Sequence, residues 1–257
     1  MKKLILLFLI ILNIATVLAQ KQNITFNHLT TDDGLSQFSV NSLYVDEQGV
    51  LWIGTREGLN RYNGSDIKTF KLQKNNPNSL FCNTVLRITG DQQGKVFLLC
   101  TEGVAEFDLI TQKFTTLLQG NVTSIYFNKR LFIGKKDEVY VYNKETRNFD
   151  LSYHLAGKDI SISCLHLDDE GSLWMGTDNS VYKLDKEKVL THPIEKGNTT
   201  SIYQDSSGEL WIGSWEYGLY HVDKDGVIHN MRHDPQNPNS IASDFVRDCC
   251  EDNNGNI

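Results

Sequence analysis

One short pattern recurs along this chain of 257 residues. The stretch DEQGVLWIGTREGLNRYN begins at Asp46 and returns as DDEGSLWMGTDNSVYKLD from Asp168 and DSSGELWIGSWEYGLYHVD from Asp205. Looser copies are DQQGKVFLLCTEGVAEFD from Asp91 and KRLFIGKKDEVYVYN from Lys129, the last without the Asp and the first Gly. A further copy starts in EDNNGNI. The aromatic anchors stand 45, 35, 42 and 37 residues apart at Trp52, Phe97, Phe132, Trp174 and Trp211. Repetition near 40 residues indicates a stack of similar units.

Each copy encodes turns and short strands. In Asp-x-x-Gly, the Asp side chain accepts a backbone hydrogen bond, and Gly takes the positive φ that closes a hairpin. The apolar run 50–53 predicts a strand buried on both faces. Strands are also predicted over 40–45, from Leu59 to Tyr62, and over 66–71. We expect Gly54 to leave room for a neighbouring sheet and Gly58 to permit the next turn.

Four antiparallel strands in each unit predict an all-β fold, a β-propeller. One blade cannot bury its faces alone, so the aromatic anchors are expected to fill the gaps between stacked blades. The sequence predicts an incomplete propeller, with about five blades and the start of a sixth. A β-sandwich would not need the same turn and aromatic five times, and solenoid repeats are usually shorter, roughly 20–30 residues.

The first residues predict a secretory signal peptide over 1–19, followed by the propeller over 20–257. Lys2 and Lys3 precede an apolar run, and small residues follow up to Ala19. The alternative is an uncleaved membrane anchor, but Asn13 interrupts the run and a span usually needs about 20 apolar residues. No other stretch predicts a membrane span.

Composition and cysteine spacing exclude several classes of protein. A net charge of −7 with 22% charged residues fits a soluble globular domain and not a protein that binds nucleic acid through bulk charge. An odd number of irregularly spaced cysteines is a poor disulfide framework. We interpret them as small buried apolar residues, with the adjacent last two on opposite faces of a strand. They are Cys82, Cys100, Cys164, Cys249 and Cys250.

The residues offer no catalytic set, no metal site and no cofactor motif. Asp168, Asp169 and Glu170 could suggest acid–base chemistry or a cation, but Asp168 occupies the repeated turn position. The segment 252–255 lacks the spacing and closing Glu of a calcium loop. The seven histidines share no ligand spacing, and no Gly-x-Ser-x-Gly motif occurs. The sequence therefore predicts that this chain is not an enzyme.

Ligand binding is predicted where loops gather around a propeller's central channel. If the first strand of each blade is innermost, the loop after the second strand (the exit loop) and the loop leading into the next blade (the lead-in loop) share one face. Aromatic rings beside carboxylates and amides suit sugar rings. The alternatives are that Trp215 and Tyr217 pack on the adjacent blade and that Arg56 is a solvated surface charge. The candidates are Trp215, Tyr217, Glu216, Arg56, Glu57, Asn179, Asn83 and Phe38.

The pattern Asp-x-x-Gly-x-Leu-Trp-Ile-Gly-Thr-x-x-Gly-Leu resembles the two-component regulator propeller repeat. FNHLTTDDGLSQFSVNSLYVDEQG, from Phe26, also resembles it. The resemblance is strongest in blades 1, 4 and 5. Blades 2 and 3 depart from it, because Leu99 replaces the Gly and Lys135 the Thr.

In that family such repeats form the periplasmic sensor part of hybrid two-component systems that regulate transcription, often in response to oligosaccharides. The resemblance implies a periplasmic chain, an oligosaccharide or other small ligand, and no nucleic-acid contact by this segment. It places the histidine kinase core, the inner-membrane helix and any dimer in a longer parent, of which this chain would be a truncated form or fragment. A strand near Ile24–Leu29 would then complete a blade that is absent. The alternatives are a secreted propeller lyase or glycosidase and a non-catalytic interaction scaffold.

Overall fold

The copies of the repeat each build one antiparallel sheet of four strands, joined in chain order from first to fourth. The computed structural model describes residues 27–155 and 160–257. This described part contains no α-helix and one 3-10 turn, Thr31–Asp33. The strands of blades 1 and 2 are β1 (Val40–Val45), β2 (Leu51–Thr55), β3 (Gly58–Tyr62), β4 (Ile67–Phe70), β5 (Val85–Gly90), β6 (Lys95–Cys100), β7 (Gly103–Asp108) and β8 (Lys113–Gln119). Those of blades 3, 4 and 5 are β9 (Ser124–Asn128), β10 (Arg130–Lys135), β11 (Glu138–Asn143), β12 (Asn148–His154), β13 (Ile162–Leu167), β14 (Leu173–Thr177), β15 (Val181–Leu184), β16 (Leu190–Ile194), β17 (Thr199–Gln204), β18 (Leu210–Ser214), β19 (Leu219–Val222) and β20 (Ile228–Met231).

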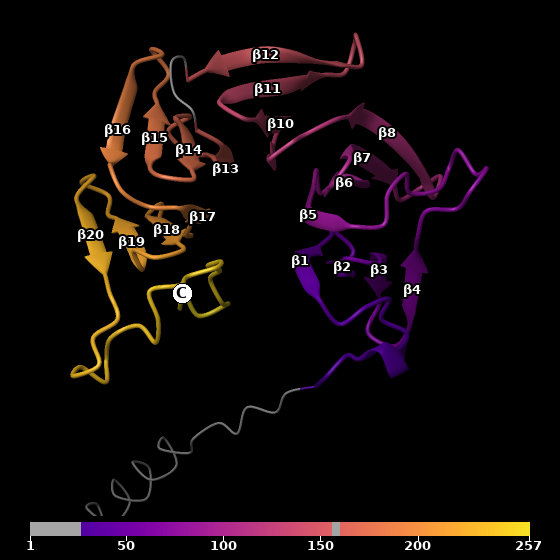
Figure 1. Cartoon of the computed structure of the whole chain (residues 1–257), viewed down its shortest axis with the longest axis horizontal. Helices are drawn as coiled ribbons and strands as arrows, with labels where there is room; N and C mark the ends of the chain where they lie inside the picture. The colour runs from indigo at the N-terminus through magenta and orange to yellow at the C-terminus, as the bar shows by residue number, and fades with distance from the viewer. Residues whose placement is uncertain (1–26, 156–159) are drawn as a thin grey trace, which may run out of the picture. The chain divides into compact units, whose positions relative to one another are not determined.

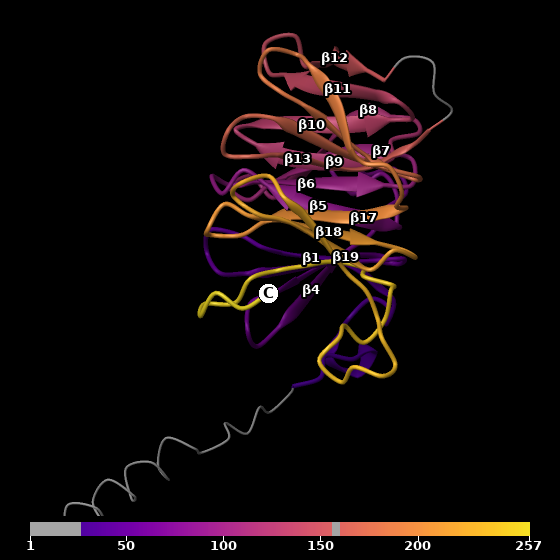
Figure 2. The same ribbon diagram turned by 90° about the vertical axis from the view of Figure 1, so that its left-hand side faces the viewer.

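The first strand of each blade is the innermost. Contacts run in series from β1 to β5, β9, β13 and β17. Figure 1 shows the fourth strands β4, β12, β16 and β20 at the outside of this compact unit, which spans Thr31–Ile257. Figure 2 shows β5, β9, β13 and β17 running nearly side by side. The arrangement is a β-propeller of five four-stranded blades, which confirms the predicted fold class.

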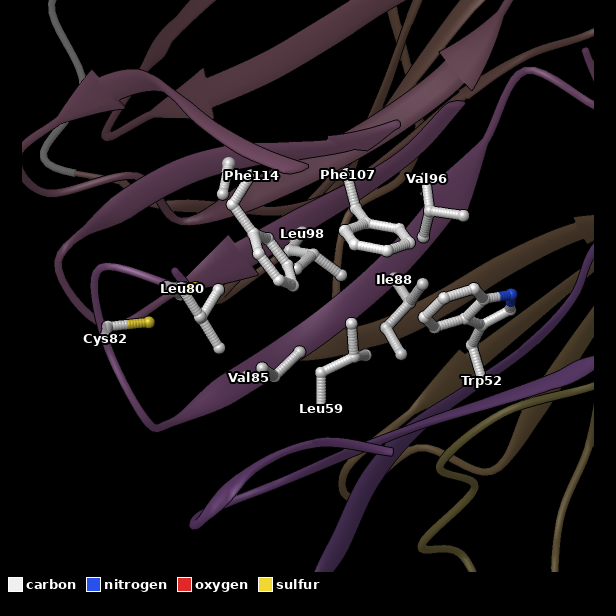
Figure 3. Packing of buried hydrophobic residues seen from close by; sticks show 12 residues of the cluster. Trp52, Leu59, Leu80, Cys82, Val85, Ile88, Val96, Leu98, Phe107 and Phe114 are labelled. Atoms are coloured by element: carbon white, nitrogen blue, oxygen red, sulfur yellow. The ribbon is translucent and has the colours of Figure 1, made fainter. Parts of the chain in front are cut away.

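Most of the aromatic anchors lie between neighbouring blades. Trp52 is fully buried, with its ring centroid 5.3 Å from that of Phe107 in blade 2 and 6.1 Å from that of Phe70 in its own blade. Figure 3 shows this cluster, in which side chains of β2 and β3 meet side chains of β5, β6 and β7. Because both faces of each second strand are covered, these strands read as continuous apolar runs. The predicted role in blade packing is confirmed for Trp52, Phe97, Phe132 and Trp174, whereas Trp211 is half-buried and stacks on His221 of its own blade.

A carboxylate binds the anchor indole in three of the blades. Oδ1 of Asp46 accepts the backbone N–H groups of Gln48 and Val50 at 3.0 Å, which closes the hairpin as predicted. Its Oδ2 accepts the indole Nε1–H of Trp52 at 2.8 Å. The equivalent indole bond, also 2.8 Å long, joins Trp174 to Asp168 and Trp211 to Asp205. We call each such couple an Asp–Trp pair.

In blades 1, 3 and 4 the glycine two residues after the anchor lets the next blade approach. A Cβ on Gly54 would lie 2.8 Å from Cγ1 of Val85 in β5. A Cβ on Gly134 would lie 3.1 Å from Cγ2 of Ile162 in β13, and one on Gly176 would lie 2.6 Å from Cγ2 of Thr199 in β17. Such distances are shorter than a carbon–carbon contact, so no larger residue fits without movement. The expectation for Gly54 is therefore confirmed.

The predictions about the cysteines are confirmed for three of them and wrong for the last two. Cys82, Cys100 and Cys164 are buried free thiols, as predicted. Contact with the thiol of Cys82, together with burial, raises the pKa of Cys100. The prediction for Cys249 and Cys250 is wrong, because Cys250 is exposed and no strand forms there. The surrounding segment is held instead by isolated hydrogen bonds, such as Val246 N–H to the carbonyl of Ser214 at 2.9 Å.

The predicted signal peptide, 1–19, lies outside the described residues, as do residues 24–26 of the strand predicted near Ile24–Leu29. Residues 27–29, the remainder of that predicted strand, form no strand in the structure.

Candidate ligand-binding site

A buried hydroxyl shapes the exit loop of blade 1. Oγ1 of Thr55 accepts the N–H of Glu57 at 3.1 Å and donates to the carbonyl of Gly58 at 3.0 Å. Thr177 and Ser214 make the matching bonds in blades 4 and 5. All three hydroxyl residues are buried. These hydrogen bonds hold the backbone of the exit loop from its buried side. The residues that follow the hydroxyl residue are exposed to solvent.

Exit loops and lead-in loops meet at one end of the blades. The hydroxyl of Thr84, which leads into blade 2, donates to the carbonyl of Arg56 at 3.2 Å. The N–H of Trp215 donates to the carbonyl of Asn198, which leads into blade 5, at 2.8 Å. These bonds place the two kinds of loop on a common face, as the sequence predicts.

Trp215 is the most accessible indole on this face. Its side chain is 39% exposed. The ring meets Phe245 edge-on, with centroids 5.6 Å apart, and the guanidinium carbon of Arg247 lies 5.4 Å from the ring centroid. The indole therefore packs partly on the following segment and still presents apolar surface beside a cation.

Tyr217 packs against other side chains, whereas Glu216 is exposed to solvent. Tyr217 is half-buried against the core between blades 4 and 5, and the guanidinium carbon of Arg232 lies 5.6 Å from its ring centroid. Arg232 is held by Asp244 at 2.6 Å, a hydrogen bond that lowers the pKa of the Asp244 carboxyl. Tyr217 thus fits the packing alternative. Glu216 is exposed.

The other predicted residues are spread over blades 1, 2 and 4. Arg56, Glu57 and Asn179 are exposed in their exit loops. The side-chain oxygen of Asn83 accepts the N–H of Leu72 at 2.8 Å, so this amide shapes the lead-in loop. Phe38 is 80% exposed.

A cavity of about 460 Å³ occupies the channel between the first strands. Of the eight predicted residues, only Trp215 lines it. The guanidinium of Arg87 reaches across from blade 2 and donates to the carbonyl of Thr200 in blade 5 at 3.2 Å. Arg247 and Asp248 add one charge of each sign to the wall. The cavity therefore offers hydrogen-bond donors and acceptors beside one exposed indole.

Sequence reasoning missed most residues that line the cavity, although a signal for them exists. Positions five residues before the turn aspartates face the channel in four copies of the repeat. These are Asn41, Ser163, Thr200 and Arg247. Because strand residues alternate between two sides, counting back from these four aspartates would have identified the channel-facing position.

The described residues contain no group of three or more His, Cys, Asp or Glu side chains placed to hold a metal ion. Asp248 is the one carboxylate that lines the channel cavity, and no His of the described chain does so. This wall can hold a polar ligand by hydrogen bonds and by contact with the indole.

Comparison with known families identifies the repeat. The two-component regulator propeller family matches residues 34–57, 156–179 and 194–216. The chain carries two-component regulator propeller repeats. The three matches fall on blades 1, 4 and 5, where the resemblance in the sequence is strongest.

The regulator propeller is also similar to known proteins. It is 49% identical to histidine kinase P4 of Formosa agariphila over 59 residues, which are 23% of this chain and 4% of the kinase. The extracellular domain of a hybrid two-component system of Bacteroides thetaiotaomicron superposes with a TM-score of 0.56 at 20% identity, over 88% of this chain and 39% of that domain. Virginiamycin B lyase of Staphylococcus aureus superposes with a TM-score of 0.63 at 14% identity, over 83% of this chain and 74% of the lyase.

These similarities show a propeller like the sensor regions of hybrid two-component systems. At such identities the superpositions show the fold alone. The regulator propeller spans less than two-fifths of the length of the Bacteroides domain and a small part of the kinase. In the described residues, no helix is long and apolar enough to cross a membrane.

Proposed function

We propose that this regulator propeller senses an oligosaccharide on the outer side of the inner membrane, as the input part of a hybrid two-component system. The observation that carries the proposal is the 39% exposed indole of Trp215 beside the guanidinium of Arg247 at the channel cavity. A sugar ring has an apolar face for the indole and hydroxyl groups for the charged and polar wall.

The other predicted residues take secondary roles in this proposal. The exposed side chains of Arg56, Glu57, Asn179 and Glu216 extend the binding face beyond the cavity, and Phe38 adds a second exposed ring. Asn83 and Tyr217 act by shaping the loops. The signal passes to a histidine kinase core in a longer parent protein, which acts as a dimer, and this segment binds no nucleic acid.

Calorimetric titration of the purified chain with a panel of neutral and acidic oligosaccharides tests the proposal. We expect at least one to bind, and Trp215→Ala to weaken that binding at least tenfold. Ile110→Ala is the matched control, because Ile110 is 88% exposed in the turn between β7 and β8 at the other end of blade 2. Equal binding by both variants would contradict the site.

Two outcomes would redirect the assignment. If the chain binds no sugar, an interaction scaffold is favoured. If chromatography shows that the chain cleaves a bound oligosaccharide into shorter ones, the protein would be an enzyme. The lyase similarity shows the fold alone and does not favour catalysis here.

Export is tested separately. Alkaline phosphatase fused after residue 40 is expected to be active in a Gram-negative host, because that enzyme folds only after export. An inactive fusion would contradict the periplasmic location.

A further inference from the structure

A second groove lies between blades 2 and 3 and has a volume of about 890 Å³. Its walls include the turn residues Asp91 and Gln93 of blade 2 and Lys129 of blade 3. In antiparallel blades, the turn between the first and second strands and the exit loop between the second and third lie at opposite ends. The groove therefore opens away from the face that carries Trp215.

The first departure from the repeat at this groove concerns the Asp–Trp pair. Phe97 stands six residues after Asp91, where blades 1, 4 and 5 place their indole. Oδ1 of Asp91 still accepts the N–H groups of Gln93 and Lys95, at 2.8 and 2.9 Å. The phenylalanine side chain has no N–H to donate, and no hydrogen bond from the described residues reaches Oδ2 of Asp91. Since Asp91 and Phe97 both line the groove, this oxygen is available to a ligand.

The second departure is the residue that replaces the close-packing glycine. In blade 2 this residue is Leu99, which is buried against Val122 and Ile125 of blade 3. A leucine side chain where other blades have only a hydrogen keeps the two sheets further apart. In agreement, β6 meets β9 more sparsely than β2 meets β5, β10 meets β13 or β14 meets β17.

The third departure is a shortened hairpin in blade 3. Only Lys129 separates β9 from β10, and it has a φ of 56°. In blades 1, 4 and 5 the same connection holds five residues, 46–50, 168–172 and 205–209. The shorter turn removes the wall that an Asp-x-x-Gly loop would form beside blade 2. All three departures therefore open the same junction.

The groove combines aromatic surface with charged groups at its rim. The ring of Phe97 is stacked on that of Phe127 with centroids 5.4 Å apart, and Tyr142 lies half-buried nearby in the same wall. Lys95 is already held by Glu106 at 2.7 Å and by Asp108 at 2.6 Å. Lys129, Arg130, Lys144 and Arg147 also line the groove, and none of them is ion-paired within the described chain. The carboxylates of Glu145 and Asp150 line the groove as well, so its five basic side chains exceed its four carboxylates by one, in a chain with a net charge of −7.

We propose that this groove binds an oligosaccharide that carries an acidic group. A sugar ring lies against Phe127 and Tyr142, a sugar hydroxyl donates to Oδ2 of Asp91, and the acidic group meets the free cations. The inference rests on the proposed function only for the ligand class, because the groove and the Trp215 site lie at opposite ends of the blades.

The test variant restores the indole of the repeat in blade 2. In Phe97→Trp the indole N–H donates to Asp91 and the ring fills the floor of the groove, as in blades 1, 4 and 5. We expect this variant to bind a tetrasaccharide of uronic acid at least tenfold more weakly than the parent chain does. Its melting temperature is expected to rise by roughly 2–4 °C because one buried hydrogen bond is gained.

Two further variants complete the design. Phe132→Trp is the matched control, because Phe132 is an equally buried anchor that does not line the groove and has no turn Asp. It is expected to leave binding unchanged. Asp91→Asn, which keeps the turn and replaces the accepting oxygen by an amide, is expected to weaken binding about three- to tenfold.

The probes separate the possible failures. A neutral tetrasaccharide of equal length should bind at least tenfold more weakly than the uronic acid probe, and inorganic sulfate should not compete below millimolar concentration. Loss of binding in Trp215→Ala but not in Phe97→Trp would overturn the groove and leave the proposed function intact. The reverse pattern would support the groove and contradict the channel site, and a chain that binds neither saccharide would overturn both.

Discussion

At the scale of single residues, the Asp–Trp pair ties the turn of each blade to the core between blades. The sequence predicts both parts separately, since Asp-x-x-Gly indicates a hairpin and a lone Trp in an apolar run indicates core. It does not predict the bond, although the six-residue spacing from Asp46 to Trp52 recurs from Asp168 and Asp205. Whether the indole N–H points back to the turn depends on the twist of the hairpin, which the spacing alone does not specify.

Replacing an anchor Trp by Phe should cost most where the carboxylate is most buried. Trp52→Phe leaves an oxygen of Asp46, the most buried of these carboxylates, without its donor, so we expect a loss of about 2–3 kcal/mol in the free energy of unfolding. Trp211→Phe is the control, because Asp205 is only half-buried and water can replace the indole. Urea denaturation of both variants measures the difference. Equal losses would mean that the indole bond contributes little beyond packing.

The ion cluster around Lys95 gives stability that depends on pH. The side-chain hydrogen bond from Lys95, helped by the N–H groups of Ile110 and Thr111, lowers the pKa of Asp108 to about 2. Because the unfolded value is near 3.9, the contribution is present above pH 4 and is lost as the pH falls toward 2.

Asp108→Asn should therefore lower the free energy of unfolding by about 1 kcal/mol near pH 6, after allowance for solvent screening at this partly exposed site. The difference from the unsubstituted chain should vanish near pH 2. Denaturant titrations at several pH values check this, and a difference that is constant with pH would contradict it.

At the scale of strands and sheets, the glycine after the anchor sets the distance between blades. The sequence predicts a strand over 40–45, and β1 has the same bounds in the structure. The prediction succeeds because turn residues follow the strand and fix where it ends. The two outer strands of blade 1 are also predicted to within about one or two residues of their observed ends. The groove between blades 2 and 3 is not predictable in this way, since its volume depends on how Leu99 and the short β9–β10 turn displace whole sheets.

Gly176→Ala tests the close approach. The new Cβ would lie 2.4 Å from Sγ of Cys164 and 2.6 Å from Cγ2 of Thr199, so we expect a loss of about 2–4 kcal/mol in stability. Combining it with Cys164→Ala removes the nearer of the two clashes. The double variant should lose less than the sum of the single losses, as measured by thermal unfolding. Strict additivity would show that the clash with Cys164, the cross-strand neighbour of Gly176 in the same blade, contributes nothing to the loss.

At the scale of the whole molecule, stability comes from contacts between neighbouring blades and is concentrated in the second strands. The residues of the second strands are mostly buried, whereas β12, β16 and β20 expose most of theirs. The period of the repeat predicts this radial order, because one unit cannot bury both faces of its inner strands without neighbours. The ligand preference does not follow from the period, since it depends on loop residues that differ between blades.

Amide hydrogen exchange should follow the same radial order. We expect the amides of β6 and β14 to exchange at least tenfold more slowly than those of β12 and β16. Mass spectrometry of peptides from a time course at neutral pH measures the rates. Faster exchange in β6 and β14 than in the outer strands would contradict a core at the second strands.

The exposure of Trp215 also gives the protein its own optical reporter. Of the four tryptophans, Trp52 and Trp174 are buried and each binds a carboxylate, and Trp211 is partly covered in the same way. Their fluorescence should therefore be blue-shifted and poorly quenched by dissolved acrylamide. The emission of Trp215 should lie at longer wavelength and be quenched first, so occupancy of the channel mouth can be followed by light without a label.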